Sequence, residues 1–343
     1  MKERDNWPVV SIIMPTLNCG TILEECLSYL AKQNYNQDKI EIVIADAGST
    51  DNTVKVAKKY QAKVYPNPLK TSEAGKAVAV KKAKGELFLF LDSDNLMTDE
   101  NFLTKLVEPL IKDKTLIGSE PLYYTYRKED PMISRYTSMM GLVDPVIYFT
   151  GNYDRFCILS GKWTRLPIKF EDKGDWLKLK LEKGRVPTLG SNGSLLRRSI
   201  FNLDQVGDYL FDNDNISELV QKKPAYFAKI KIGIVHKFSA TLATFGRKQR
   251  RRIKDFLYNQ SKGMRTYQSD VKNTGLVWFT IYTVLIFPVI LQSFIGFIKK
   301  PDIAWFTHPI LCWITLWVYG KEVLVAKLKG AEEESRDNWQ QAK

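Results

Sequence analysis

The stretch Leu-Phe-Leu-Phe-Leu-Asp-Ser-Asp-Asn, residues 87–95, decides the expected fold. Five consecutive large apolar residues are typical of a strand that is buried on both faces of a parallel sheet. Two carboxylates, Asp92 and Asp94, follow directly, and acids at this spacing can share one hard cation such as Mg²⁺ or Mn²⁺. The alternative interpretation is a solvated turn or helix cap, which also favours aspartate.

Two earlier stretches have the same layout of an apolar strand followed by polar residues. Residues 9–14 are mostly apolar and lead into the turn Pro15–Asn18, and residues 40–45 lead into Asp46 and Gly48. In an open parallel sheet, ligands bind beyond the carboxyl ends of the strands. The three strand ends therefore predict one binding site.

Helical patterns separate these strands, and we expect Thr21 and Glu24 to form a capping box at the start of the first helix. The order βαβαβαβ predicts an α/β fold with a mostly parallel sheet and flanking helices. The remaining expected elements are helices at about 21–30, 53–60 and 72–84 and a short strand at 63–65.

Three motifs, at residues 10–18, 42–53 and 89–95, resemble glycosyltransferase family 2, and the resemblance extends over about 8–250. It implies a GT-A (Rossmann-like) fold, inversion at the anomeric carbon, a nucleotide-sugar donor and a divalent metal, Mn²⁺ or Mg²⁺. Asp92 and Asp94 are the implied metal ligands, with Asp94 the more direct one. The candidate donor-site residues are Pro15, Thr16, Asn18, Asp46, Ser49, Lys76 and Asp92.

Asp46 bears on the identity of the nucleotide, because a carboxylate there can accept a hydrogen bond from the imide N–H of uracil and would favour UDP. Ser49 and Asp51 are expected to cap the following helix, which would leave Asp46 for a ligand. Ala47 stands where the family often has a second aspartate. The nucleotide therefore stays open at this point.

The acceptor side is expected in the less regular middle of the chain. Gly-Ser-Asn-Gly-Ser at 190–194 resembles the acceptor loop of the family, and Phe-Asp-Asn-Asp at 211–214 resembles its base motif. An acidic stretch at 171–176 is rejected as the base because it precedes this loop. The candidate acceptor residues are Asn192, Gly193 and Arg197, and the candidate bases are Asp212 and, in reserve, Asp214.

The net charge of +13 calls for an anionic partner, and a basic run at 247–254 holds six cationic side chains. Nucleic acid is not expected, since no recognised nucleic-acid motif occurs and the run adjoins an apolar segment. The run resembles an interfacial helix on anionic lipid or a cover for the diphosphate. The candidate residues for either role are His236, Arg247, Arg250 and Arg251.

Two apolar runs follow, at about 275–298 and 303–320, and the first has no charged residue over a length that can span a bilayer. Lysines at both flanks and in the connecting loop predict a helical membrane hairpin with both ends, and the catalytic domain, on the cytoplasmic side. The second run is short, so a re-entrant or interfacial helix is an alternative. A buried core pair of helices is the other.

Together these features predict four segments and one function. The function is inverting, metal-dependent transfer from a nucleotide diphosphate sugar to a lipid-linked or membrane-proximal acceptor, with a carboxylate base. A polyprenyl-phosphate acceptor, which needs no base, and a non-catalytic nucleotide-sugar-binding subunit are the alternatives. The segments are a catalytic domain at 1–235 (donor half about 8–100, acceptor half about 100–235), a basic interfacial segment at 236–272, membrane segments at 273–330 and a charged tail at 331–343.

Overall fold

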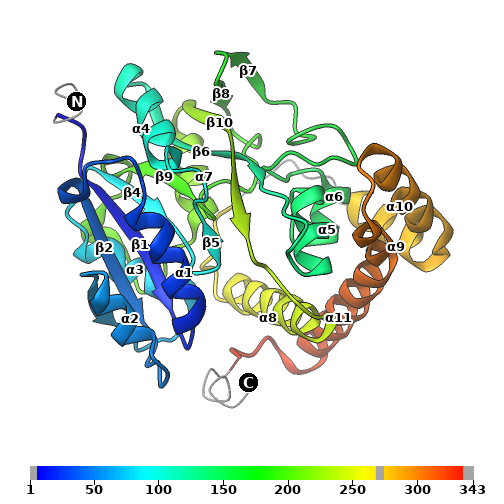
Figure 1. The fold of residues 1–343 in the computed structure, drawn as a ribbon. Helices are drawn as coiled ribbons and strands as arrows, with labels where there is room; N and C mark the ends of the chain where they lie inside the picture. The colour runs from blue at the N-terminus through cyan, green and yellow to red at the C-terminus, as the bar shows by residue number, and fades with distance from the viewer. Residues whose placement is uncertain (1–5, 268–273, 335–343) are drawn as a thin grey trace.

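The computed structural model describes residues 6–267 and 274–334. Within them, one sheet of ten strands lies between layers of helices, and a further group of helices packs beside it (Figure 1). The strand order is β3-β2-β1-β4-β9-β6-β10-β8-β7, with the short strand β5 paired to β10.

The first half of the sheet confirms the predicted alternation. Strands β1 to β4 run parallel, so that Val10 faces Ile40 of β2 on one side and Leu87 of β4 on the other. The elements are β1 (Val10–Thr16), α1 (Gly20–Ala31), η2 (Gln37–Lys39), β2 (Ile40–Asp46), α2 (Thr53–Lys59), β3 (Lys63–Pro66), α3 (Ser72–Lys82) and β4 (Leu87–Phe90).

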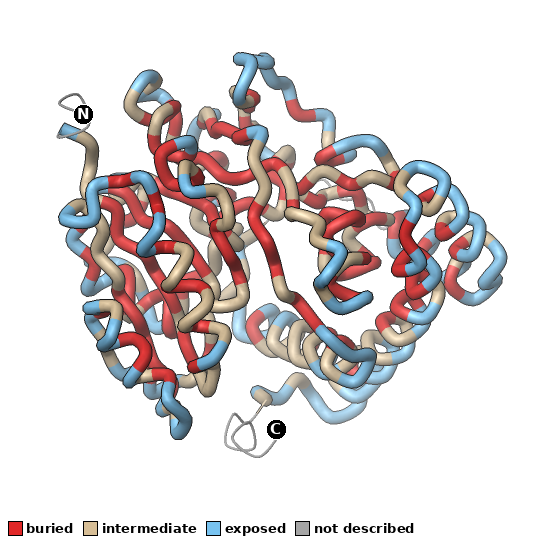
Figure 2. Tube along the Cα trace, viewed as in Figure 1, coloured by how far each residue is buried: buried red, intermediate tan, exposed pale blue. Residues whose placement is uncertain are grey.

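Residues of one strand alternate between two cores, because successive side chains point to opposite faces. Ile12 of β1 packs with Leu27 of α1 on one face. Ile13 packs with Val80 of α3 on the other. Figure 2 shows the strands as the most buried part of the chain.

The second half of the sheet is mixed. Strand β9 is antiparallel to both neighbours, β10 is parallel to β6, and β8 is antiparallel to both of its neighbours. The elements are β5 (Asn95–Leu96), α4 (Phe102–Lys112), β6 (Leu116–Tyr124), β7 (Lys169–Asp172), β8 (Trp176–Leu181), β9 (Ser194–Arg197), η3 (Arg198–Ile200), η4 (Leu203–Gln205), α7 (Asp212–Lys222) and β10 (Ala225–His236). The acidic stretch at 171–176 lies on the exposed β7–β8 hairpin, where Asp172 pairs with Lys231.

Helix α1 begins differently from the prediction. Its N-cap is Cys19, which makes no side-chain capping bond, so the capping box of Thr21 and Glu24 is wrong. The amide of Gly20 instead donates to Asp51, and the amide of Cys19 donates to Thr53. The next strand-end loop therefore caps this helix, a partner that helix periodicity does not reveal.

The remaining helices gather beside the sheet, where α8 packs along α11 and α6 packs on α9. The apolar run at 275–298 is not one straight helix, since α9 and α10 meet at Ile286 with a bend of 94°. The elements are α5 (Met132–Met140), α6 (Pro145–Thr150), α8 (Leu242–Ser261), α9 (Thr274–Leu285), α10 (Phe287–Lys299), η5 (Ile303–Thr307) and α11 (His308–Lys329).

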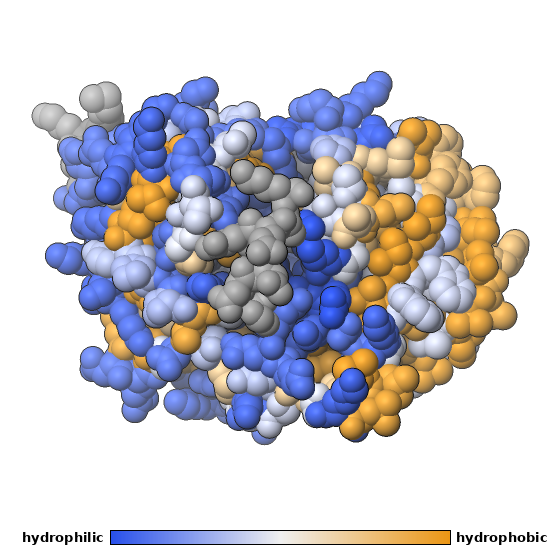
Figure 3. All heavy atoms as spheres, turned by 90° about the horizontal axis from the view of Figure 1, so that it is seen from below, coloured by the Kyte–Doolittle hydropathy of each residue, from blue (hydrophilic) through white to orange (hydrophobic). Residues whose placement is uncertain are grey.

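By length and composition, the segment Ile303–Lys329 is one helix that could cross a membrane, and the bent pair counts as a second only if taken as one broken span. Only 22% of the apolar window in this segment is buried, which argues against a core helix. Large apolar side chains of α9, α10 and α11 are exposed. Figure 3 shows them as a continuous hydrophobic surface at one end of the molecule.

Candidate active site

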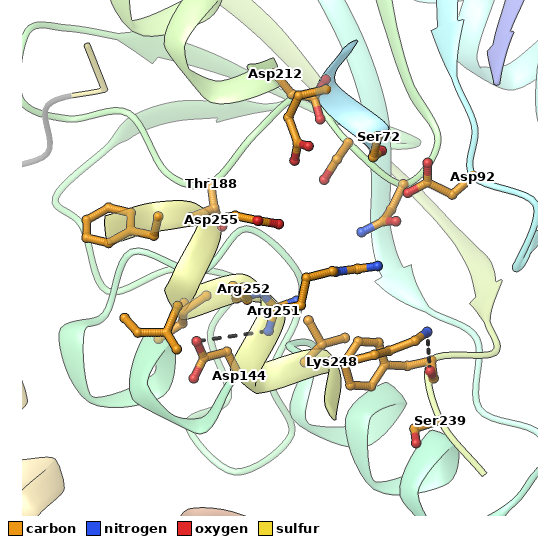
Figure 4. A pocket seen from close by; sticks show the side chains of 18 of the residues that line it. Ser72, Asp92, Asp144, Thr188, Asp212, Ser239, Lys248, Arg251, Arg252 and Asp255 are labelled. Carbon is orange, nitrogen blue, oxygen red and sulfur yellow. Dashed lines mark hydrogen bonds and ion pairs between the residues drawn. The ribbon is translucent and has the colours of Figure 1, made fainter. Parts of the chain in front are cut away.

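A cavity of about 1360 Å³ opens at the carboxyl ends of β1 and β4. Pro15, Thr16 and Asn18 line it from the first strand end, and Asp92 and Asp94 line it from the later one. Figure 4 shows Asp92 and Asp212 on one side and Arg252 and Asp144 on the other, with Arg251 between them. The structure thus brings together most of the side chains that the sequence places at strand ends.

Asp94 is held beside β10 because β5 pairs antiparallel with the end of that strand. Its carboxylate lies 3.7 Å from Nε2 of His236 and 3.4 Å from Nζ of Lys248. Burial opposes ionisation of Asp94, but His236 and Lys248 lower its pKa below the ordinary value. Burial also lowers the pKa of His236 to about 4, so the imidazole is neutral near pH 7 and Lys248 supplies the positive charge.

The two aspartates fit a hard divalent cation, because carboxylate oxygens are the ligands that Mg²⁺ and Mn²⁺ prefer. Burial raises the pKa of Asp92, and Lys76 opposes that rise. In the described part of the chain, no group of three His, Cys, Asp or Glu side chains is placed to hold a metal. A cation here would therefore complete its coordination with water or ligand oxygens.

The carboxylate of Asp46 already has hydrogen-bond partners and is not free to contact a nucleobase, which corrects the expectation from the sequence. One of its carboxylate oxygens accepts hydrogen bonds from the hydroxyls of Thr16 and Ser49. The other accepts from the amides of Gly48 and Ser49. Asp46 lines a separate, smaller hollow instead of the main cavity, so its role in this structure is to join two strand-end loops.

Asn18 belongs to the same junction. Its φ of 46° is a left-handed conformation that asparagine tolerates better than most residues. Its amide donates to the Ser49 hydroxyl, and its side-chain oxygen accepts from the amide of Thr50. Ser49 is therefore a partner of Asn18 and Asp46, and it does not line the main cavity.

Lys76 and Asp212 form an ion pair inside the cavity, where both side chains are nearly buried. Lys76 comes from α3, and Asp212 is the first residue of α7. Burial raises the pKa of Asp212 to about 6, although Lys76 lowers it. The second carboxylate oxygen of Asp212 is buried and has no hydrogen-bond partner among the described residues, which leaves its lone pairs unused.

Asp214, the reserve base, lies outside the cavity, which corrects that expectation. Its buried carboxylate accepts from the guanidinium of Arg265 at 3.0 Å and from the amide of Thr266 at 2.8 Å. These bonds fix the segment after α8 against α7. In a helix the two acids face different directions, since residues two apart do not share a face.

The acceptor-loop candidates separate in the structure. Asn192 lines the cavity, and its side-chain amide donates to the hydroxyl of Tyr124 at 3.0 Å. Gly193 has a φ of 89° and donates its amide to the carbonyl of Phe90, so it supports the turn without lining the cavity. The prediction that Arg197 contacts the acceptor is corrected, because its guanidinium donates to the backbone carbonyls of Leu110 and Leu116, away from the site.

A buried charge network beneath this loop was not predicted. Glu120 accepts from Arg155 at 2.7 Å, and it also contacts Lys229 and the hydroxyl of Ser194. Arg155 in turn donates to the carbonyl of Asn192 at 3.2 Å. Isolated charges of this kind give no sequence signal, because strand pairing brings them together from four separate segments.

The basic helix α8 divides into two faces. Arg247 and Arg251, two of the candidates for a contact with diphosphate or lipid, line the cavity, and so do Lys248 and Arg252, which were missed. Their spacing of one, four and five residues is that of one helix face, a signal that could have found them. The prediction that Arg250 contacts diphosphate or lipid is corrected, since Arg250 points to α11 and pairs with Glu322 at 2.9 Å.

Comparison with known proteins accords with this geometry. Residues 11–175, just under half of the chain, match the family model described as glycosyl transferase family 2. By this match, the region is similar to glycosyltransferase family 2. It is a family of enzymes, and the matched residues include β1, β2 and the Asp92–Asp94 pair.

Curated relatives share the same region. The chain is 38% identical over 96 residues to the poly(ribitol-phosphate) beta-N-acetylglucosaminyltransferase TarS of Staphylococcus aureus, covering 26% of this chain and 17% of that protein. It is 29% identical over 128 residues to the glycosyltransferase GlyG of Streptococcus pneumoniae, covering 36% of this chain and 41% of that protein. The chain thus spans less than half of the length of these relatives.

One solved structure resembles nearly the whole chain. The mannosyltransferase PcManGT from Pyrobaculum calidifontis, in complex with GDP-Man and Mn²⁺, superposes with a TM-score of 0.52. The match covers 95% of this chain and 88% of that one at 14% sequence identity. At that identity the likeness establishes the fold alone, a mixed α/β sheet of the GT-A type with flanking helices.

Proposed function

We propose that the protein is a metal-dependent, inverting glycosyltransferase that uses a nucleotide diphosphate sugar. The observation that carries this proposal is the position of Asp92, Asp94 and Asp212, which reach one cavity from the segment after β4 and from the start of α7. Asp92 and Asp94 would hold the cation. A bound divalent cation neutralises the charge that develops on a departing diphosphate.

The donor would lie along the first strand ends, over Pro15, Thr16 and Asn18. Its diphosphate would lie between the acidic pair and the cations Lys248 and Arg251, which extend from α8 into the same space. TarS is named as an N-acetylglucosaminyltransferase and the structural neighbour is bound to GDP-Man, so UDP as the nucleotide of this protein stays a proposal.

Asp212 is the proposed base. Direct displacement requires a carboxylate that removes the proton of an acceptor hydroxyl as the hydroxyl attacks the anomeric carbon. Asp212 faces the cavity with one oxygen unpartnered among the described residues and with a pKa raised to about 6 by burial. Asn192, at the rim of the same cavity, would position the acceptor.

The acceptor is proposed to be lipid-linked, with the enzyme seated on the cytoplasmic side of a cell membrane. Exposed apolar side chains on α9 to α11 would enter the bilayer, and the basic face of α8 lies next to them. Because α9 and α10 are bent by 94°, we propose that this pair lies in one leaflet as a re-entrant element.

Transfer and donor hydrolysis by the detergent-purified chain test this function. UDP-, GDP- and dTDP-sugars would be screened with Mn²⁺ or Mg²⁺, using Asp94→Asn and Asp212→Asn. The matched control is Asp172→Asn, an exposed carboxylate on the β7–β8 hairpin. Loss of several kcal/mol of charge stabilisation predicts a fall of about 10²-fold or more for Asp94→Asn, and the same loss on metal chelation.

Each variant separates the proposal from its alternatives. Full transfer by Asp212→Asn would contradict the base and support an acceptor that is already ionised, such as a polyprenyl phosphate. Nucleotide binding with no turnover of any donor or acceptor would support a binding subunit. Equal activity of Asp94→Asn and Asp172→Asn would contradict the assignment of Asp94 as a metal ligand.

A further inference from the structure

The cavity continues beyond the acidic pair into an apolar arm between three helices. Helices α6, α9 and α11 form the walls of this arm. Helices α6 and α9 pack on one another through Phe149 and Phe279, whose ring centroids lie 5.4 Å apart. The residues that define the apolar arm are Val146, Ile147, Leu276, Phe279, Leu316 and Gly320.

The inner end of the apolar arm is charged. The hydroxyl of Tyr319 on α11 donates to Asp144 at 2.5 Å. Arg252 on α8 lies 4.0 Å from the same carboxylate oxygen, and Arg247 lines the cavity from the same helix. The arm therefore begins where the basic face of α8 ends, in one continuous space with Asp92 and Asp212.

The outer end opens on the hydrophobic surface of the helix group. Leu276 is 48% exposed, and its neighbours Val277 and Trp278 are 56% and 54% exposed. Thr280, a polar residue in the wall, donates its hydroxyl to the carbonyl of Leu276, so α9 satisfies it internally. A wall of this kind suits a hydrocarbon, which brings no polar group that needs a partner.

We propose that the apolar arm holds the hydrocarbon chain of a phosphate-linked lipid acceptor, with its phosphate at Arg252 and Arg247. This inference rests on the proposed function and deepens it, because it assigns the acceptor class to a site. The chain would run from the basic residues to the hydrophobic surface. The group attached beyond the phosphate would then lie toward Asp212.

Gly320 provides a direct test of the apolar arm. A Cβ built on this residue meets nothing within 4 Å, and the glycine lines the cavity. Gly320→Leu would therefore add a side chain at the wall of the arm without a clash at its Cβ and with a better helix former. Lys321→Leu is the matched control, since it adds the same side chain to the next position of α11, which is exposed and outside the cavity.

The experiment measures binding of prenyl monophosphates of increasing chain length to the full chain in one detergent. Burial in the apolar arm predicts a gain of about fourfold for each added methylene in wild type and in Lys321→Leu. Gly320→Leu should lose most of this dependence while binding nucleotide as wild type does. Prenyl alcohols should bind about tenfold or more weakly than the phosphates.

Equal dependence on chain length in all three proteins would overturn the inference, because partition into detergent is common to them. A loss of nucleotide binding in Gly320→Leu would also overturn it, since the substitution would then act through the fold. Normal length-dependent binding without any sugar transfer would instead contradict the proposed function and leave the apolar arm in place.

Discussion

The ammonium of Lys76 donates a hydrogen bond to the carboxylate of Asp212, although the two residues are 136 positions apart. The pair joins the donor half of the sheet to the element that begins after the acceptor loop. Asp92 lies close enough to act electrostatically on both residues. Lys76 therefore links the carboxyl groups of Asp92 and Asp212, which would otherwise act separately.

This pair makes the pH profile a test of the base. A base with a pKa of about 6 is protonated below that pH, so the acidic limb of kcat/KM should fall near pH 6. Lys76→Met removes a cation that lowers the pKa of Asp212, so the limb should move to higher pH. Lys81→Met, an exposed change on the same helix, should leave the limb in place.

A limb that stays near pH 6 in Lys76→Met would contradict control of Asp212 by the lysine. A limb that disappears in Asp212→Asn, with residual activity at all pH values, would show that the titrating group is Asp212 itself. The profiles should be recorded at saturating metal, so that ionisation of Asp94 does not contribute.

Gly190 offers a second way to displace Asp212. It has a φ of 112°, and a Cβ there would lie 3.0 Å from both Cβ and the carbonyl oxygen of Asp212. Gly190→Ala should therefore lower stability by about 1–3 kcal/mol through backbone strain and also reduce transfer. Gly174→Ala is the control, with a φ of 85° and no atom near its Cβ.

Both glycine variants should show lower midpoints in thermal unfolding, since alanine is strained at either φ. Only Gly190→Ala should lose transfer activity when both are assayed well below their midpoints. Equal activity of the two variants would indicate that the contact of the loop with Asp212 has no part in positioning the base.

The strand ends show how much could be predicted and why. Strands β1, β2 and β4 each end within two residues of the end of their apolar runs, so Asp92 and Asp94 could be placed at the cavity from local pattern alone. Asp144, Lys248 and Arg252 reach the same space through the packing of α6 and α8, which depends on long-range contacts. Local sequence does not reveal such contacts. The hydrogen bond from Thr16 to Asp46 was not predicted for the same reason.

The helix break at Ile286, between α9 and α10, was not predicted for a different reason. The run at 275–298 is uniformly apolar, so hydropathy gives no boundary inside it. Pro288 was an available signal, because proline restricts the residue before it and removes a helical hydrogen bond. The structure places Pro288 in the first turn of α10, where that missing bond does no harm.

The buried network at Glu120 predicts a stability effect that is separable from chemistry. Glu120 is fully buried and contacts both Arg155 and Lys229. Glu120→Gln would leave the two buried cations with a single carboxylate among the described residues, that of Asp154, so the free energy of unfolding should fall by about 3–5 kcal/mol. Asp172→Asn breaks an exposed pair and should leave the free energy of unfolding almost unchanged.

Chemical denaturation of both variants measures this difference. A loss in Glu120→Gln similar to that of Asp172→Asn would mean that water or a shifted proton compensates the buried charges. Because Arg155 also holds the carbonyl of Asn192, we expect a raised KM for the acceptor in any Glu120 variant that folds.

The hydrophobic surface predicts membrane binding that depends on particular residues. Phe287 and Ile298 on α10 are 70% and 79% exposed, so each would bury most of its side chain on entering a bilayer. Replacing either by glutamate should weaken binding to anionic vesicles about tenfold or more, from the lost burial of about 1.5–3 kcal/mol. Leu69→Glu, a similar change at an exposed leucine near the donor-site loops, should have little effect.

Vesicle flotation of the three variants at two salt concentrations separates the apolar and electrostatic parts. Binding should become weaker at high salt in every protein, because the chain carries a net charge of +13 and salt screens charges near the surface. The glutamate variants on α10 should lose a further, salt-independent part. Binding that falls to the same extent in Leu69→Glu would show that net charge, and not insertion of α10, holds the protein on the membrane.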